Sequence, residues 1–229
     1  MSPAAGWGRM VDVVDAVLFD LDGVIVDSEP VWEEVRRAYV AEHGGVWQPD
    51  TQRRLMGMST AEWAEYLSGE LGVDRSAEQV ATEVVTEMAR RYAQHVPLID
   101  GADAVVRRIA ARWPLGLASS SPTRLIAAAL DATGLAGAFG ATLSTEETAR
   151  GKPAPDVWLA VAQRLGVDPA RCVAVEDSSN GVRSAAAAGC RVVAVPHASY
   201  PLDPDAEALA AVLLPSIGAL TPEVVAGID

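Results

Sequence analysis

The chain has 229 residues, of which 50% are hydrophobic and 21% are charged, a composition typical of a globular protein rather than a disordered one. Its 31 acidic and 18 basic residues give a formal net charge of −13 at pH 7, which argues against nonspecific binding to nucleic acid or to an anionic membrane surface. The two cysteines, Cys172 and Cys190, lie in apolar segments, so we expect buried, reduced thiols rather than a disulfide.

The N-terminal segment and the apolar runs of the chain carry no pattern typical of export or membrane insertion. The first ten residues lack an apolar core of signal-peptide length, and no stretch reaches the roughly 18 apolar residues of a membrane span. We therefore expect a soluble, cytoplasmic protein, monomeric because its helical faces are used in packing. In so acidic a chain, an anionic substrate would need a metal ion or a lysine to bind.

The first predicted element is a strand at residues 13–19, a short apolar run rich in β-branched residues that suits a strand buried on both faces of a parallel sheet. It leads into Asp20 and Asp22, followed by Gly23, which permits a tight turn. Because ligands of open α/β sheets bind just beyond the carboxyl ends of the strands, this carboxylate pair is a candidate site. Taken alone, the pair fits two solvated side chains equally well.

Between residues 30 and 95, apolar residues recur at helical spacing and no strand pattern interrupts them. This texture predicts an all-helical insert, so we expect a helical cap domain at residues 30–96. The α/β core domain is then split into residues 1–29 and 97–229, with hinges at residues 28–30 and 97–100.

After residue 97, helical and strand patterns alternate. Such alternation implies a doubly wound parallel sheet with right-handed crossovers, a Rossmann-like α/β core. We expect Ser121 to cap a helix that begins at Pro122 and ends at Gly134. The predicted strands are residues 115–118, 139–143, 172–175, 191–195 and an edge strand at 210–214, and the predicted helices are residues 102–113, 122–134, 157–165 and 182–188.

Polar residues follow these strands at the edge of the sheet where their carboxyl ends meet: Asp20 and Asp22, Ser119, Lys152, and Glu176 with Asp177. Carboxylates supply the hard oxygen ligands that favour Mg²⁺, and carboxylates crowded together without a cation would have raised pKa values.

Lys152 and two serines are candidates for binding a phosphate group at the same edge. Lys152 is the only lysine of the chain, and a compact ammonium suits a phosphate contact. Ser119 offers a hydroxyl, and the amide of Ser120 lies at a strand-to-helix turn, where anions bind. As single features, they also fit a surface lysine and helix-capping serines.

Four segments of the sequence resemble the four ordered motifs of the haloacid dehalogenase-like hydrolase superfamily, in its branch of helical-cap phosphatases and beta-phosphoglucomutases. The segments are DLDGVIVDSEP at residues 20–30, LASSSP at 117–122, GKPAPD at 151–156 and VEDSSNGVRSAAAAG at 175–189. The resemblance covers residues 13 to 215, and it implies a central first strand and a helical cap that closes over the site.

The resemblance also implies roles for the candidate residues. Asp20 is then the nucleophile that forms an aspartyl-phosphate, and Asp22 is the general acid and base, whose backbone carbonyl also contacts the metal. Ser119, Ser120 and Lys152 hold the phosphoryl group. Glu176 and Asp177 complete a Mg²⁺ site with Asp20 and Asp22.

These roles predict a Mg²⁺-dependent phosphatase that acts on a small phosphorylated metabolite such as a sugar phosphate. A beta-phosphoglucomutase-like isomerase with the same nucleophile and a non-catalytic ligand-binding protein are the alternatives. The mutase pattern has a His where this chain has Trp32, an Arg where it has Thr60, and a Lys where it has Pro122. These departures favour hydrolysis.

The cap is expected to select the substrate. Candidate contacts are Trp32, Met56, Met58, Ser59 and Trp63, each of which also fits the interior of the cap. Residues 57–60 are the segment expected to face the site, and Thr60 is the residue whose substitution should change substrate preference.

Overall fold

The computed structural model describes residues 14–55, 58–197 and 201–228 of the chain. Six parallel strands form one sheet in the order β3-β2-β1-β4-β5-β6, which confirms the predicted doubly wound α/β fold. All four residues of β1 are buried, and this strand lies between β2 and β4 at the centre of the sheet. The strands are β1 (Ala16–Phe19), β2 (Leu115–Ser119), β3 (Ala141–Ser144), β4 (Cys172–Glu176), β5 (Arg191–Ala194) and β6 (Val212–Leu213).

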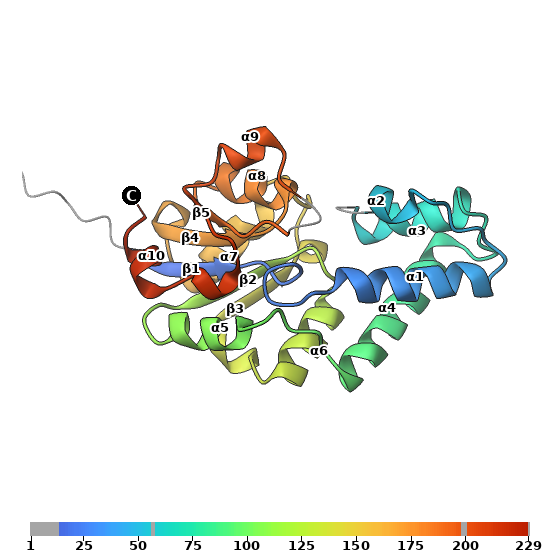
Figure 1. Cartoon of the computed structure of the whole chain (residues 1–229), viewed down its shortest axis with the longest axis horizontal. Helices are drawn as coiled ribbons and strands as arrows, with labels where there is room; N and C mark the ends of the chain where they lie inside the picture. Colours follow the sequence, from blue (N-terminus) through green and yellow to red (C-terminus); the bar gives the residue numbers. More distant parts are fainter. Residues whose placement is uncertain (1–13, 56–57, 198–200, 229) are drawn as a thin grey trace, which may run out of the picture.

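Helices cover both faces of the sheet, as Figure 1 shows. Side chains alternate along a strand, so Val17 and Phe19 of β1 pack in a cluster with α5 and α6, whereas Ala16 and Leu18 pack in a second cluster with α7 and α8. From residue 102 onward the helices are α5 (Ala102–Ala110), α6 (Thr123–Thr133), α7 (Asp156–Leu165), α8 (Ser179–Ala187), α9 (Pro204–Glu207) and α10 (Pro222–Ala226), with short 3₁₀ turns at Ala136–Ala138, Thr145–Glu147, Pro169–Arg171 and Ile217–Ala219.

Four helices lie between β1 and α5 and form a group beside the sheet, on the right in Figure 1. Their longest member packs against α6, so the group rests on one flank of the α/β part. The two connecting segments run together, with a hydrogen bond from Asp27 N to Pro97 O of 2.8 Å and a bridge between Val26 and Leu98. The four helices are α1 (Glu29–Glu42), α2 (Thr51–Leu55), α3 (Thr60–Gly69) and α4 (Ala77–Gln94).

The start of α6 differs from the prediction. Pro122, not Ser121, precedes the first helical residue, and its extended backbone (ψ 141°) cannot begin the helix. Ser121 does not cap α6 because its hydroxyl is bonded to Asp22 instead. Gly134 ends this helix in the left-handed conformation, as predicted.

Other boundaries move by a few residues: α5 ends at Ala110 rather than at residue 113, and α8 begins at Ser179 rather than at residue 182. Both cysteines are buried free thiols, as expected. Among the described residues, none of the helices combines the length and the apolar character that a membrane crossing requires.

Candidate active site

The site begins where the order of the sheet reverses. β1 pairs with β4 on one side and with β2 on the other, so the residues that follow these three strands meet at one edge. Asp20 comes directly after β1, and its backbone N–H donates to Val175 O of β4 at 3.0 Å. Ser119 ends β2, and Glu176 ends β4 with Asp177 next to it. The topology therefore brings together side chains that are more than 150 positions apart in the sequence.

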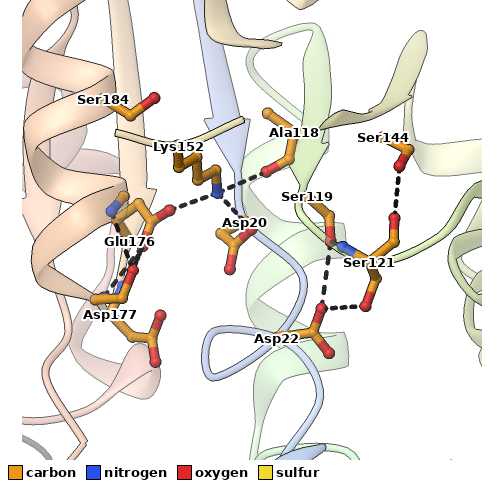
Figure 2. A network of polar contacts seen from close by, with 12 residues as sticks. Asp20, Asp22, Ala118, Ser119, Ser121, Ser144, Lys152, Glu176, Asp177 and Ser184 are labelled. Carbon is orange, nitrogen blue, oxygen red and sulfur yellow. Dashed lines mark hydrogen bonds and ion pairs between the residues drawn. The ribbon is translucent and has the colours of Figure 1, made fainter. Parts of the chain in front are cut away.

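Lys152 is the centre of a buried network that Figure 2 shows. Its Nζ donates to Asp20 Oδ1 at 2.7 Å, to Glu176 Oε1 at 2.6 Å and to the backbone oxygen of Ala118 at 3.0 Å. The lysine side chain is 7% exposed, and its Nζ lies 4.8 Å from the ring centroid of Trp158. All three ammonium donors are used, so the lysine has a fixed position between two carboxylates.

The second carboxylate oxygen of Glu176 is also held by hydrogen bonds. Glu176 Oε2 accepts from the backbone N–H groups of Asp177 and Ser178 and from the Ser178 hydroxyl, at 3.0–3.1 Å. Ser178 also caps α8, accepting from Gly181 N at 3.1 Å. A Cβ on Gly181 would lie 1.8 Å from Glu176 Oε1, so this helix position must be glycine for the carboxylate to fit. We call Asp20, Lys152, Glu176 and Asp177 the strand-end cluster.

Asp22 is held by two serines from the loop after β2. Its Oδ2 accepts from the Ser121 hydroxyl at 2.7 Å and from the Ser119 hydroxyl at 3.2 Å, and Ser119 Oγ in turn accepts from Ser121 N (Figure 2). Ser119 is fully buried, so its hydroxyl orients Asp22 in this structure. The other oxygen, Asp22 Oδ1, is buried and has no hydrogen-bond partner among the described residues.

Burial raises the pKa of Asp20 and Asp177, because both carboxyl groups lose water and face further acidic neighbours. Lys152 opposes this effect on both residues. Burial alone would lower the pKa of Lys152, but the attraction of Asp20 and Glu176 outweighs burial and leaves the lysine pKa raised. Lys152 is therefore charged at neutral pH. Its single positive charge does not balance the carboxyl groups of Asp20, Glu176 and Asp177 around it.

This shortage of positive charge fits a divalent cation. One oxygen each of Asp20, Glu176 and Asp177 lies within 4.8 Å of the others. Hard carboxylate oxygens at such separations match the ligand preference of Mg²⁺. Both Glu176 oxygens already accept hydrogen bonds, so Asp20 and Asp177 are the carboxylates most available to an ion.

Gly23 has φ +76°, and a Cβ there would lie 1.9 Å from Asp177 Oδ2, so this glycine leaves the space that Asp177 occupies.

A cavity of about 640 Å³ opens above the cluster, between the strand ends and helices α1–α3. Asp22, Lys152 and Asp177 lie on its core side, together with Ser120 and Ser121. Of the cap residues expected to contact substrate, Trp32, Met58, Thr60 and Trp63 line it, whereas Met56 and residue 57 lie outside the described residues.

Ser59 does not line this cavity. Its hydroxyl accepts from Glu62 N, and the Glu62 carboxylate accepts from Ser59 N, which is a capping box for α3. The structure gives Ser59 a role at the start of α3, and its expected contact with substrate stays a prediction.

The cap side of the cavity also carries polar residues that the sequence analysis did not select: Glu29, Arg36 and Gln52. With Trp32 and Trp63 we call them the cap wall. Arg36 lies on the buried face of α1 together with Trp32, Val35 and Tyr39. An arginine within the apolar stripe of an amphipathic helix was the available signal, because such a stripe normally excludes charge.

Comparison with known proteins adds three findings. The family model of the haloacid dehalogenase-like hydrolases matches residues 14–189. A phosphorylated carbohydrates phosphatase of Thermotoga maritima is 32% identical over 80% of this chain and 86% of that protein, and hexitol phosphatase B of Escherichia coli strain K12 is 33% identical over 82% and 86%. The crystal structure of CbbY from Rhodobacter sphaeroides with phosphate superposes with a TM-score of 0.80 at 24% identity, covering 91% of this chain and 96% of that one.

Proposed function

The chain belongs to the haloacid dehalogenase-like hydrolase family, and we propose that it hydrolyses a small phosphorylated metabolite, such as a sugar phosphate, through an aspartyl-phosphate on Asp20 with the help of Mg²⁺. The relatives confirm the predicted enzyme class, a phosphoric monoester hydrolase. The observation that carries the proposal is the buried triad in which Lys152 bridges Asp20 and Glu176 beneath the cavity.

Asp20 suits the role of nucleophile because its two oxygens differ. Oδ1 is bonded to Lys152, whereas Oδ2 makes no hydrogen bond within the described residues. Attack by an Asp20 oxygen on phosphorus breaks the bond to the substrate oxygen and replaces one difficult displacement with two easier steps. Water then attacks the phosphorus of the aspartyl-phosphate and releases phosphate and the free carboxylate.

Asp22 suits the role of acid and base. Two serine hydroxyls fix its Oδ2, which leaves Oδ1 to carry a proton toward the leaving oxygen in the first step. The same oxygen accepts a proton from the attacking water in the second step. General acid–base catalysis of this kind contributes about 10²–10⁴ in rate.

Positive charge on the phosphoryl oxygens is the main requirement of phosphoryl transfer, and Lys152 supplies part of it. The other part is assigned to Mg²⁺, with Asp20 and Asp177 as its carboxylate ligands and Glu176 as the residue that orients Lys152. When bound, the ion polarises the phosphoryl group and neutralises its oxygens. Ser120 lies in the cavity wall at the turn before α6, where its backbone can approach the same group.

Residues 30–96 are proposed to act as the cap domain that covers this site and excludes water from it. Hydrolysis is favoured over isomerisation because Trp32 and Thr60 line the cavity at the positions where the mutase pattern has a titratable His and a cationic Arg. An indole and a hydroxyl do not supply the charge that the mutase pattern has at these two positions.

The test is phosphate release from phenyl phosphate and a panel of sugar phosphates, with Mg²⁺ and then with excess EDTA. Wild-type protein should release phosphate, and EDTA should abolish the release. Asp20→Asn, which keeps the side-chain volume, should lose about 10⁴-fold or more of kcat while remaining folded. Asp103→Asn, at an exposed position in the first turn of α5, is the matched control and should behave as wild type.

Two outcomes would point elsewhere. Conversion of glucose 1-phosphate to glucose 6-phosphate without net phosphate release would identify an isomerase. Binding of Mg²⁺ and phosphate analogues without turnover of any substrate would identify a ligand-binding protein.

A further inference from the structure

Arg36 is a buried cation that the proposed chemistry does not use. It is 6% exposed, and no hydrogen bond or ion pair joins it to any residue that the structure describes. Its guanidinium lies over two indoles, 4.3 Å from the ring centroid of Trp32 and 4.9 Å from that of Trp63. Stacking removes water from the faces of the guanidinium, so only its edge, with the N–H donors, remains for a partner.

A second group of the cap wall is short of a partner as well. Gln52 Nε2 donates to Glu29 Oε2 at 2.8 Å, which fixes the orientation of the amide, and Gln52 Oε1 is then buried without a donor. Both Arg36 and Gln52 line the cavity above Lys152 and Asp177. Buried polar groups without partners are costly, so two of them on one cavity wall indicate a ligand that supplies their hydrogen bonds.

The charge around Arg36 indicates which chemical group that ligand presents. Glu29, Glu33 and Arg36 follow one another at intervals of four and three residues, so they share one face of α1, and all three line the cavity. Two carboxylates beside one guanidinium repel a second anionic group. A hydroxyl suits the site better, because it can accept from the guanidinium and donate to an amide or carboxylate oxygen.

We propose that Arg36 and Gln52, assisted by Glu29, bind hydroxyl groups at the end of the substrate remote from its phosphate, and so make the enzyme selective for polyol or sugar phosphates. This inference rests on the proposed function, because it assigns the phosphate to Lys152 and the strand-end cluster. Trp32 and Trp63 hold the guanidinium in place and exclude water from these hydrogen bonds.

The test compares kcat/KM for mannitol 1-phosphate, which carries hydroxyls, with kcat/KM for phenyl phosphate, which carries none. Arg36→Met should lower the ratio of these two values about 10- to 100-fold, mainly through KM, because hydrogen bonds to a charged group are lost. Gln52→Leu should lower the ratio about 2- to 10-fold, as expected for a neutral hydrogen bond. Arg37→Met is the matched control: the neighbouring side chain is 65% exposed, and the ratio should not change.

Two further measurements distinguish substrate recognition by Arg36 from a packing role and from binding of a second anion: thermal unfolding and turnover of fructose 1,6-bisphosphate. The Tm of Arg36→Met should stay level or rise, because the variant removes an unpaired buried charge. Equal losses on mannitol 1-phosphate and phenyl phosphate, with a lower Tm, would make Arg36 a packing residue and overturn the proposal. A loss confined to the bisphosphate would overturn it in favour of a second anion. Wild-type protein that released no phosphate from any of the three would instead refute the proposed function, and this inference with it.

Discussion

The two sides of the cavity hold their charged groups in opposite ways. In the strand-end cluster, each ammonium donor of Lys152 is hydrogen-bonded and both Glu176 oxygens accept. On the cap wall, Arg36 is also buried, but its guanidinium stacks on two indoles and makes no hydrogen bond or ion pair with a described residue. Groups that must stabilise developing charge gain from being fixed in advance, whereas a group that recognises a ligand must keep its hydrogen bonds free. The contrast therefore fits a division of roles, in which the strand-end cluster serves phosphoryl transfer and the cap wall recognises the substrate.

Lys152→Met tests the paired side and should have the largest effect. The substitution leaves Asp20 and Glu176 buried without their cation, and breaking a buried pair in this way costs about 3–5 kcal/mol. Phosphate release should also fall by about 10²–10³ or more. Urea unfolding and a phosphate assay measure the two losses.

Arg150→Met is the matched control for this prediction. Arg150 is 68% exposed, and its ion pair with Asp156 is worth about 1 kcal/mol or less. If Lys152→Met and Arg150→Met were equally stable, burial would not be the source of the stability that the strand-end cluster contributes. The comparison between this cluster and the cap wall would then be wrong.

Gly181→Ala should have the next largest effect, because it pushes Glu176 out of position. Its Cβ would lie 1.8 Å from Glu176 Oε1, so either the carboxylate or α8 must move, at about 1–3 kcal/mol. Gly69→Ala is the control: this residue ends α3, is exposed, and has no atom within 4 Å of the added Cβ, so alanine should be neutral or slightly stabilising. Equal Tm values for the two variants would contradict the tight fit of Glu176.

Ser121→Ala tests the orientation of Asp22 with a smaller change. The variant removes a 2.7 Å hydrogen bond to Oδ2, so we expect a loss of about 1 kcal/mol in stability and about tenfold in kcat. KM should change little, because the hydroxyl acts through Asp22 rather than on the substrate. A loss that appeared only in KM would show that Ser121 contacts the substrate directly.

The sequence predicted the paired side of the cavity far better than the cap wall, for a physical reason. Each residue of the strand-end cluster lies in or near a motif that follows an apolar strand pattern, and parallel strands bring their carboxyl ends to one edge. The predicted order of strands and helices is therefore enough to place Asp20 and Glu176 at the same edge of the sheet. The exact start of α6 was missed because the Ser121 hydroxyl had two possible uses, a helix cap or Asp22, and only the fold decides between them.

The cap wall depends on contacts that no local pattern records. Trp32 could be recognised as a candidate, but whether Arg36 meets a carboxylate or an indole depends on how α1 lies against α2 and α3. Ser59 was selected for its place in the segment expected to face the site, and the structure adds a use of its hydroxyl that the sequence analysis did not predict, the capping box of α3. The sequence shows which hydrogen bonds or ion pairs a side chain is able to form, and tertiary packing decides which partner it has.

Glu87→Gln asks whether pairing alone, without burial, stabilises the protein, and its effect should be the smallest. Glu87 of α4 accepts from Arg90 and Arg91 at 2.6–2.8 Å, and Arg91 also donates to Glu34 of α1, so this network joins two cap helices. It is as fully paired as Lys152, but its side chains are 33–62% exposed. Water and salt screen such pairs, so we expect a loss below about 1 kcal/mol that shrinks further at high salt.

The pH dependence gives the sign of this last effect. Hydrogen bonds from Arg90 and Arg91 lower the pKa of Glu87 to about 2, below its ordinary value of 4.5. A carboxyl whose folded pKa is depressed stabilises the protein above the unfolded pKa, and this stability is lost as the pH falls from 4.5 toward 2. The difference in Tm between wild type and Glu87→Gln should therefore be constant near pH 7 and decrease below pH 4.5, with Glu65→Gln, an exposed position on α3, as the control. A loss at pH 7 as large as that of Lys152→Met would mean that pairing, and not burial, sets the energy of both networks.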